Sequence, residues 1–160
     1  MFKILRAFGR RSPHERKIVV ESAAVLLATR AGLRIAGFRR WQNLLARYTP
    51  TLLPQSEAKD LAVGQSILVT ARAIAILGEA VAHHLPFQPT CLEKSLALWW
   101  LLRRHRIPAN LRIGACKDGD VFEAHAWVES DGVILSESAA DHNRFVPFES
   151  EIPSPGTHSH

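Results

Sequence analysis

The sequence predicts an α+β fold in which helices come first and an antiparallel sheet follows. Apolar residues recur at helical spacing up to about residue 105, and from residue 110 the pattern changes to an alternation typical of strands. Helices followed by a run of strands favour an α+β domain whose sheet packs against helices. With 160 residues, the chain suits one domain, which we place at residues 1–150. The Pro-, Ser- and His-rich tail, 151–160, is predicted to be flexible.

The first part of this domain, residues 1–86, is predicted to be helical. The first helix runs from His14 to about Gly32, where Ser12 before Pro13 indicates an N-cap with proline at the first helical position. Two further helices are expected, a short one over 38–48 and a long core helix over 57–84.

The second part, residues 87–150, is predicted to combine one helix with a β-meander. The helix begins at Cys91 and extends to about His105, before Pro108. Three alternating segments then read as strands, and two glycine-containing turns separate them. These strands are expected at 111–116, 121–129 and 132–137.

Composition limits the classes of function. Hydrophobic residues make up 47% of the chain, yet no uninterrupted apolar run reaches the roughly 18 residues of a membrane span. The start has no apolar core or cleavage site typical of a secretory signal, so we expect a cytoplasmic protein without a transmembrane segment. Its two cysteines are too few for a disulfide framework and have no zinc-site spacing, and we expect neither a metal nor a cofactor.

Positive charge is concentrated at the start of the chain. Residues 1–50 contain 11 Lys and Arg and two Glu, whereas residues 51–160 contain nine Lys and Arg and 13 acids. A basic face of this kind suits an acidic peptide, a partner protein, nucleic acid or a membrane surface, or is simply solvated. The basic residues lack the aromatic interleaving of a nucleic-acid surface, so we expect no nucleic acid as partner.

Cys91 and His125 are the candidate catalytic pair. A cysteine at a helix N-terminus meets the positive end of the helix dipole and unpaired N–H groups, which both favour the thiolate. A nucleophilic cysteine also needs a base, and His125 occupies a half-buried strand position where a histidine without a role would be unusual. An oxyanion hole would use the backbone N–H of Cys91 and one further donor, for which the side chain of Gln88 is a candidate. Cys116 is interpreted as a packed small residue.

The third catalytic residue depends on the register of the last hairpin. A three-residue loop at 130–132 would pair Glu129 with Val133 and set Glu137 opposite His125. A two-residue loop at 131–132 would shift the pairing by one, placing Ser138 there instead. We favour the first register, because glycine suits its third position, and therefore predict Glu137 as the acid, with Asp141 as the alternative.

The stretch "CLEKSLALWWLLRRHRIPANLRIGACKDGDVFEAHAWVESDGVIL" resembles the transglutaminase-like leader peptidases of lasso-peptide biosynthesis, often called the B protein. The similarity covers residues 88–137 closely. It implies a papain- and transglutaminase-like fold and a cysteine protease that removes the leader peptide from a ribosomally made precursor. It also implies Cys91 as nucleophile, His125 as base and Glu137 as acid, although many relatives have Asp at the last position.

The resemblance also implies partners. No strand-rich leader-recognition module precedes the helices, so the chain resembles the stand-alone peptidase of a split system. Such a peptidase would receive the precursor peptide from a separate leader-recognition protein. A lasso cyclase of the asparagine-synthetase type would then close the ring. The alternatives are an amidase or acyltransferase of the same fold, since these share the thioester intermediate, and a non-enzymatic basic adaptor.

Overall fold

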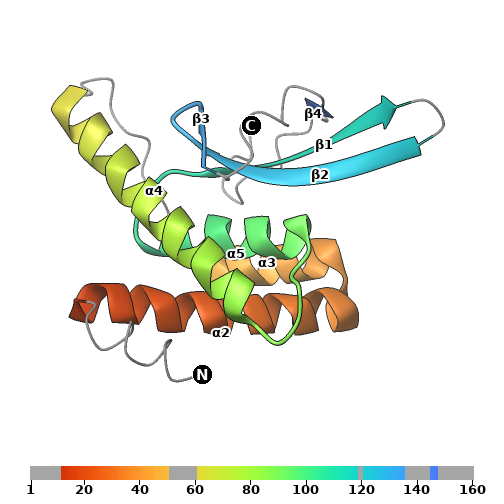
Figure 1. Ribbon diagram of the computed structural model, residues 1–160, viewed down its shortest axis with the longest axis horizontal. Coiled ribbons are helices and arrows are strands. Elements are labelled where there is room, and N and C mark those ends of the chain that lie inside the picture. Colours follow the sequence, from red (N-terminus) through yellow and green to blue (C-terminus); the bar gives the residue numbers. More distant parts are fainter. Residues whose placement is uncertain (1–11, 51–60, 119–120, 136–144, 148–160) are drawn as a thin grey trace, which may run out of the picture.

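A computed structural model describes residues 12–50, 61–118, 121–135 and 145–147 of the chain. These residues form a helical layer and an antiparallel sheet that lies over it, with one helix in the middle of the molecule between the two (Figure 1). The predicted α+β class is therefore correct. The described helices are α2 (Pro13–Ala36), α3 (Phe38–Arg47), α4 (Leu61–His84) and α5 (Cys91–Arg104).

Helix α2 begins as the sequence predicts and ends four residues later than expected. Ser12 accepts a hydrogen bond from the N–H of Glu15, and the Glu15 carboxylate accepts one from the N–H of Ser12, so the two form a capping box. The helix passes through Gly32, where a Cβ would collide with the ring of Trp41 on α3. Glycine at this position lets α3 pack directly against α2.

Helix α4 crosses the other helices and has one face in contact with them. Its small and aliphatic residues pack into the core between α2 and α5, whereas Val69 and Ile76 are 68% and 64% exposed. The segment Gly64–His84 is long and apolar enough to cross a membrane by length and composition, although Arg72 and Glu79 interrupt it. A single helix of this kind is weak evidence for insertion, because core helices of soluble proteins pass the same test.

Helix α5 forms the centre of the core. It begins at Cys91, as predicted, because Thr90 caps it: the Thr90 hydroxyl accepts a hydrogen bond from the Glu93 N–H, and the Glu93 carboxylate accepts one from the Thr90 N–H. Leucines in its middle are completely enclosed, and its contacts reach α2, α4, β1 and β2. The helix is therefore fixed on several sides, which gives its first residue a defined place.

The sheet has the strand order β3-β2-β1-β4. The meander of the first three strands was predicted, and the fourth was not. Strand β4 contains only two residues, one of them a proline that cannot donate to the ladder, so it shows no alternation in the sequence. The strands are β1 (Asn110–Asp118), β2 (Val121–Ser130), β3 (Val133–Ile134) and β4 (Val146–Pro147).

The register predicted for the β2–β3 hairpin is wrong. Ser130 pairs with Val133, and Glu129 pairs with Ile134, so the loop contains two residues rather than three. Both loop residues, Asp131 and Gly132, have positive φ angles, 53° and 74°. This is the pattern of a type I′ turn, whose twist matches that of the two strands. The pairing that would set Glu137 opposite His125 is therefore not the one that the hairpin adopts.

Candidate active site

Cys91 is held in place by contacts on both sides of the helix start. Arg30 on α2 lies with its guanidinium 4.2 Å from the ring centre of Phe87, in the preceding loop, and 3.6 Å from the carboxylate of Glu93. Glu93 is buried and also caps the helix at Thr90. These contacts fix the turn in which Cys91 is the first helical residue. Its N–H is among those that a helix leaves without an intrahelical partner.

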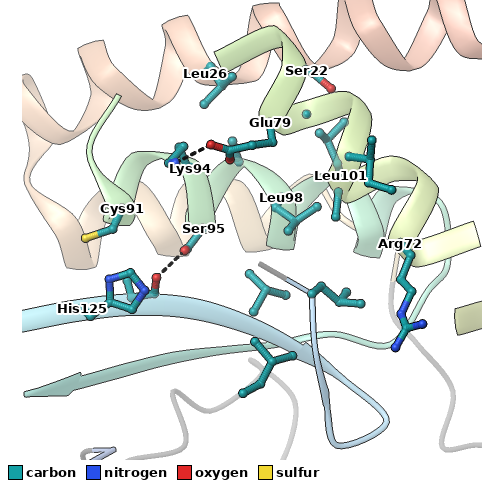
Figure 2. Close-up of a pocket in the computed structure, with 18 residues that line it drawn as sticks. Ser22, Leu26, Arg72, Glu79, Cys91, Lys94, Ser95, Leu98, Leu101 and His125 are labelled. Atoms are coloured by element: carbon teal, nitrogen blue, oxygen red, sulfur yellow. Dashed lines mark hydrogen bonds and ion pairs between the residues drawn. The ribbon is translucent and has the colours of Figure 1, made fainter. Parts of the chain in front are cut away.

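His125 lies on β2 beside the start of α5. Its side chain and that of Cys91 are both half-buried and line the same cavity. Figure 2 shows the sulfur of Cys91 and the imidazole of His125 together at one end of this cavity. The structure thus brings together two residues that are 34 positions apart in the sequence.

A hydrogen bond between helix and strand sets the relative position of this pair. Ser95, one helical turn after Cys91, donates from its hydroxyl to the carbonyl oxygen of Ala126 at 2.8 Å, and Ala126 directly follows His125 (Figure 2). Ser95 is buried. Because each partner adjoins one candidate catalytic residue, this bond limits movement of α5 relative to β2 at the site.

The ring of His125 has two aromatic neighbours. Trp127 stacks near it with a centroid distance of 6.2 Å and an interplanar angle of 15°, and Phe145 does so at 5.1 Å and 28°. Nearly parallel neighbours restrict rotation of the imidazole about its own axis. The two rings therefore favour one orientation of the His125 imidazole.

Trp127 is itself fixed by a network on β1 and β2. Its indole N–H donates to the carboxylate of Glu129 at 2.8 Å, and the Nε of Arg112 lies 3.2 Å from the other oxygen of that carboxylate. On the adjacent strand, a Cβ at Gly114 would lie only 2.9 Å from the indole ring. The missing side chain of Gly114 thus provides the space for Trp127, and the ion pair anchors its far edge.

The cavity has a volume of about 500 Å³ and runs between α4, α5 and the sheet. Most of its wall is aliphatic, and three charged side chains contribute to it. Lys94 and Glu79 form an ion pair at 2.6 Å, while Arg72 lies at the end opposite Cys91 in Figure 2. The aliphatic side chains that line the cavity are Leu26, Ala75, Ile76, Ala97, Leu98, Leu101, Ala126, Val128, Ile134 and Leu135.

The other predicted site residues are not brought to the pair by the described structure. Glu137 and Asp141 lie outside the described residues. Gln88 is exposed and is not among the residues that line the cavity. Cys116 is half-buried on β1, with its sulfur 3.8 Å from the carboxylate of Glu123. Within the described ranges, no group of three or more His, Cys, Asp and Glu has an arrangement that could hold a metal ion.

Sequence reasoning missed several residues that support the site. Ser95, Arg30 and Phe145 carry no local signal of a role, because their partners come from distant parts of the chain. Glu93 is an exception. An acid three residues after Thr90 is the sequence signature of a capping box and identifies the start of α5.

Comparison with known proteins gives one result at the family level. A model described as the Transglutaminase-like superfamily matches residues 23–150, which include both candidate catalytic residues and most of the chain. No match to a curated protein or to a solved structure accompanies it.

Proposed function

Because this chain belongs to the transglutaminase-like superfamily, we propose that it is a cysteine peptidase that removes the leader peptide from a lasso-peptide precursor. The observation that carries the peptidase chemistry is the placement of Cys91, at a helix start, and His125 in one cavity. The choice of substrate is supported by the resemblance of residues 88–137 to lasso leader peptidases.

The proposed reaction proceeds through a thioester. The thiolate of Cys91 attacks the carbonyl carbon at the junction between leader and core, forming a bond between sulfur and carbon. The carbon–nitrogen bond then breaks, and the imidazolium of His125 donates its proton to the departing amine. Water attacks the thioester carbonyl, His125 accepts a proton from it, and the leader leaves as a free acid while the thiolate is restored.

We assign the residue that orients His125 to Glu137, on the resemblance alone, with Asp141 as the alternative. An acid in this role holds the imidazole in the correct tautomer and stabilises its protonated form. Changing Glu137→Gln should therefore lower kcat by orders of magnitude, while Asp141→Asn should have little effect. The opposite ranking in steady-state cleavage assays would transfer the role to Asp141.

The proposed partners are a leader-recognition protein that delivers the precursor and a cyclase that uses the released core. Three exposed arginines are the proposed docking residues: Arg34 near the end of α2, and Arg39 and Arg40 on α3. Oppositely charged surfaces accelerate the association of two proteins, and this acceleration weakens as the salt concentration rises. Reversing the charges of these three arginines should slow cleavage of a precursor that is delivered by the leader-recognition protein. An unchanged cleavage rate at low salt would show that these arginines are not the docking residues.

An acyltransferase or amidase is the second candidate, since the same family match is compatible with it. A transferase would pass the acyl group from Cys91 to an amine instead of water. To separate the two, the protein is incubated with precursor and leader-recognition protein, with and without an added primary amine. Mass spectrometry that finds free leader acid supports the peptidase, whereas a product joined to the amine supports the transferase. An intact precursor in both samples would contradict both.

A further inference from the structure

The cavity next to Cys91 continues well beyond the candidate catalytic pair. Along α5 its wall extends from Cys91 to Leu101, which corresponds to about 15 Å at the rise of an α-helix. This length matches about four residues of extended peptide. The cavity is therefore too long to serve only the atoms that react.

The lining specifies what kind of chain would fit. Leu98 and Leu101 on α5 line the cavity (Figure 2), and so do Val128 on β2 and Ile134 on β3, so the helix and the sheet both contribute aliphatic side chains to it. The charges of Lys94 and Glu79 compensate each other in their ion pair. That leaves the cavity with an apolar middle and no net charge close to Cys91.

Among the described residues that line the cavity, Arg72 is the charged side chain without an opposite charge in an ion pair. It is exposed at the end opposite Cys91 (Figure 2), and among the described residues no ion pair involves it. An arginine in this position attracts a carboxylate that follows an apolar segment. The cavity thus has a reactive thiol at one end, a cation at the other and aliphatic walls between them.

We propose that this cavity binds an aliphatic segment of about four residues adjoining the scissile carbonyl of the peptide substrate, with an acidic residue of the substrate at Arg72. The proposal rests on the proposed function in that it takes Cys91 as the nucleophile. It adds a substrate class, aliphatic with one acid at a fixed distance. A second copy of the chain or a lipid would match the aliphatic walls but would not require the acid.

Alkylation of Cys91 tests this without requiring peptidase activity. Three probes are compared: iodoacetamide, N-octyl iodoacetamide, and the octyl probe with a terminal carboxylate. In each case the Cys91 sulfur forms a bond to the methylene carbon, and iodide leaves with the bonding electron pair. Rates at Cys91 are followed by peptide mapping, which separates it from Cys116, and are divided by the rates of free N-acetylcysteine.

The octyl probe should react at least about tenfold faster than iodoacetamide at low concentration, because each buried methylene favours binding about fourfold. The terminal carboxylate should add a further factor of about two to five, the usual range for an exposed ion pair. Arg72→Glu should abolish that added factor and leave the plain octyl probe unchanged. Arg47→Glu, which changes an exposed arginine outside the cavity, is the matched control.

A second pair of variants tests the apolar wall. Ile76→Glu changes an exposed residue that lines the cavity, whereas Val69→Glu changes an equally exposed residue of α4 outside it. Only the first should reduce the advantage of the octyl probe. Both variants change an exposed residue of the same helix, so their thermal melts should agree. A difference between them in the octyl-probe rate would then not be caused by unfolding.

Each outcome has a definite meaning. Equal normalised rates for all three probes would overturn the proposal. If the octyl probe reacts faster but neither the terminal carboxylate nor Arg72→Glu changes its rate, the acidic residue is refuted and a lipid is favoured as ligand. If the protein is a dimer that Ile76→Glu dissociates, the cavity is an interface between copies of the chain. Probe preferences as predicted, together with a precursor that is never cleaved, would contradict the proposed function and leave the cavity's specificity standing.

Discussion

The hydrogen bond from Ser95 to the carbonyl oxygen of Ala126 should be essential to the site, because it joins α5 to β2 between Cys91 and His125. We expect Ser95→Ala to lower both stability and activity. The bond is 2.8 Å long and Ser95 is only 7% exposed, so the change leaves a buried carbonyl oxygen without this donor. Such a loss costs about 1–3 kcal/mol of unfolding free energy.

Ser22 offers a matched control in the same core. It is completely buried on α2, and its hydroxyl has no hydrogen-bond partner among the described residues. Burying an unpartnered hydroxyl is unfavourable, so Ser22→Ala should be neutral or stabilising by up to about 1 kcal/mol. The two variants remove the same atom, and their difference isolates the bond made by Ser95.

Thermal unfolding and steady-state cleavage measure the two effects. For a chain of this size, Ser95→Ala should lower Tm by about 2–12 °C, because each kcal/mol corresponds to roughly 2–4 °C. Cleavage should fall by about 10–100-fold, since a misplacement of about 1 Å between reacting groups has an effect of this order. A Ser95→Ala protein as stable and as active as Ser22→Ala would refute the view that this bond positions the pair.

Three further predictions concern the turn and the support of the histidine. Gly132→Ala should lower the free energy of unfolding by about 1 kcal/mol, because the φ of 74° at this position disfavours a side chain. Gly64→Ala in α4 should raise it by up to about 1 kcal/mol, since nothing lies within 4 Å of the added Cβ. Chemical denaturation that shows the same sign for both variants would contradict this prediction. Gly114→Ala should lower the free energy of unfolding by about 1–3 kcal/mol and reduce activity, because its Cβ would lie 2.9 Å from the Trp127 ring. A thermal melt and a kcat equal to those of wild type would contradict this tight contact. Glu129→Ala should lower kcat/KM by about tenfold and the free energy of unfolding by only about 1 kcal/mol, because Trp127 loses its carboxylate partner at 2.8 Å. An unchanged kcat/KM would show that the orientation of Trp127 does not affect catalysis.

Local patterns were sufficient to predict the starts of α2 and α5 and the strand that contains His125. The start of α2 follows from Ser12 and Pro13, and the start of α5 at Cys91 follows from the spacing of its apolar residues. The position of His125 in a strand follows from alternation. These features depend on neighbours in the sequence, and their consequences are visible without knowledge of the tertiary structure.

The hairpin register could not be settled in this way. Glycine suits the last position of both candidate loops, and what decides between them is whether Asp131 also adopts a positive φ. Aspartate tolerates this conformation, and the resulting turn matches the strand twist. The choice shifts every pairing beyond the turn by one residue, so the inference that placed Glu137 opposite His125 failed with it.

The supporting contacts were beyond prediction for another reason. Ser95 donates to a backbone carbonyl, a group that every residue carries, and no feature of the sequence marks Ala126 as the acceptor. The contact of Phe145 with His125 likewise joins two segments whose approach depends on the sheet. Such contacts result from packing between elements, which a one-dimensional pattern does not contain.

The most direct test of the cysteine chemistry is the cleavage of precursor by Cys91→Ala and wild-type proteins. Each is incubated with the precursor and its leader-recognition protein, and leader release is followed by mass spectrometry. We expect wild type to release the leader and Cys91→Ala to be slower by at least about a thousandfold, with an unchanged thermal melt. Leader release by Cys91→Ala at the wild-type rate would contradict the central claim that Cys91 is the nucleophile.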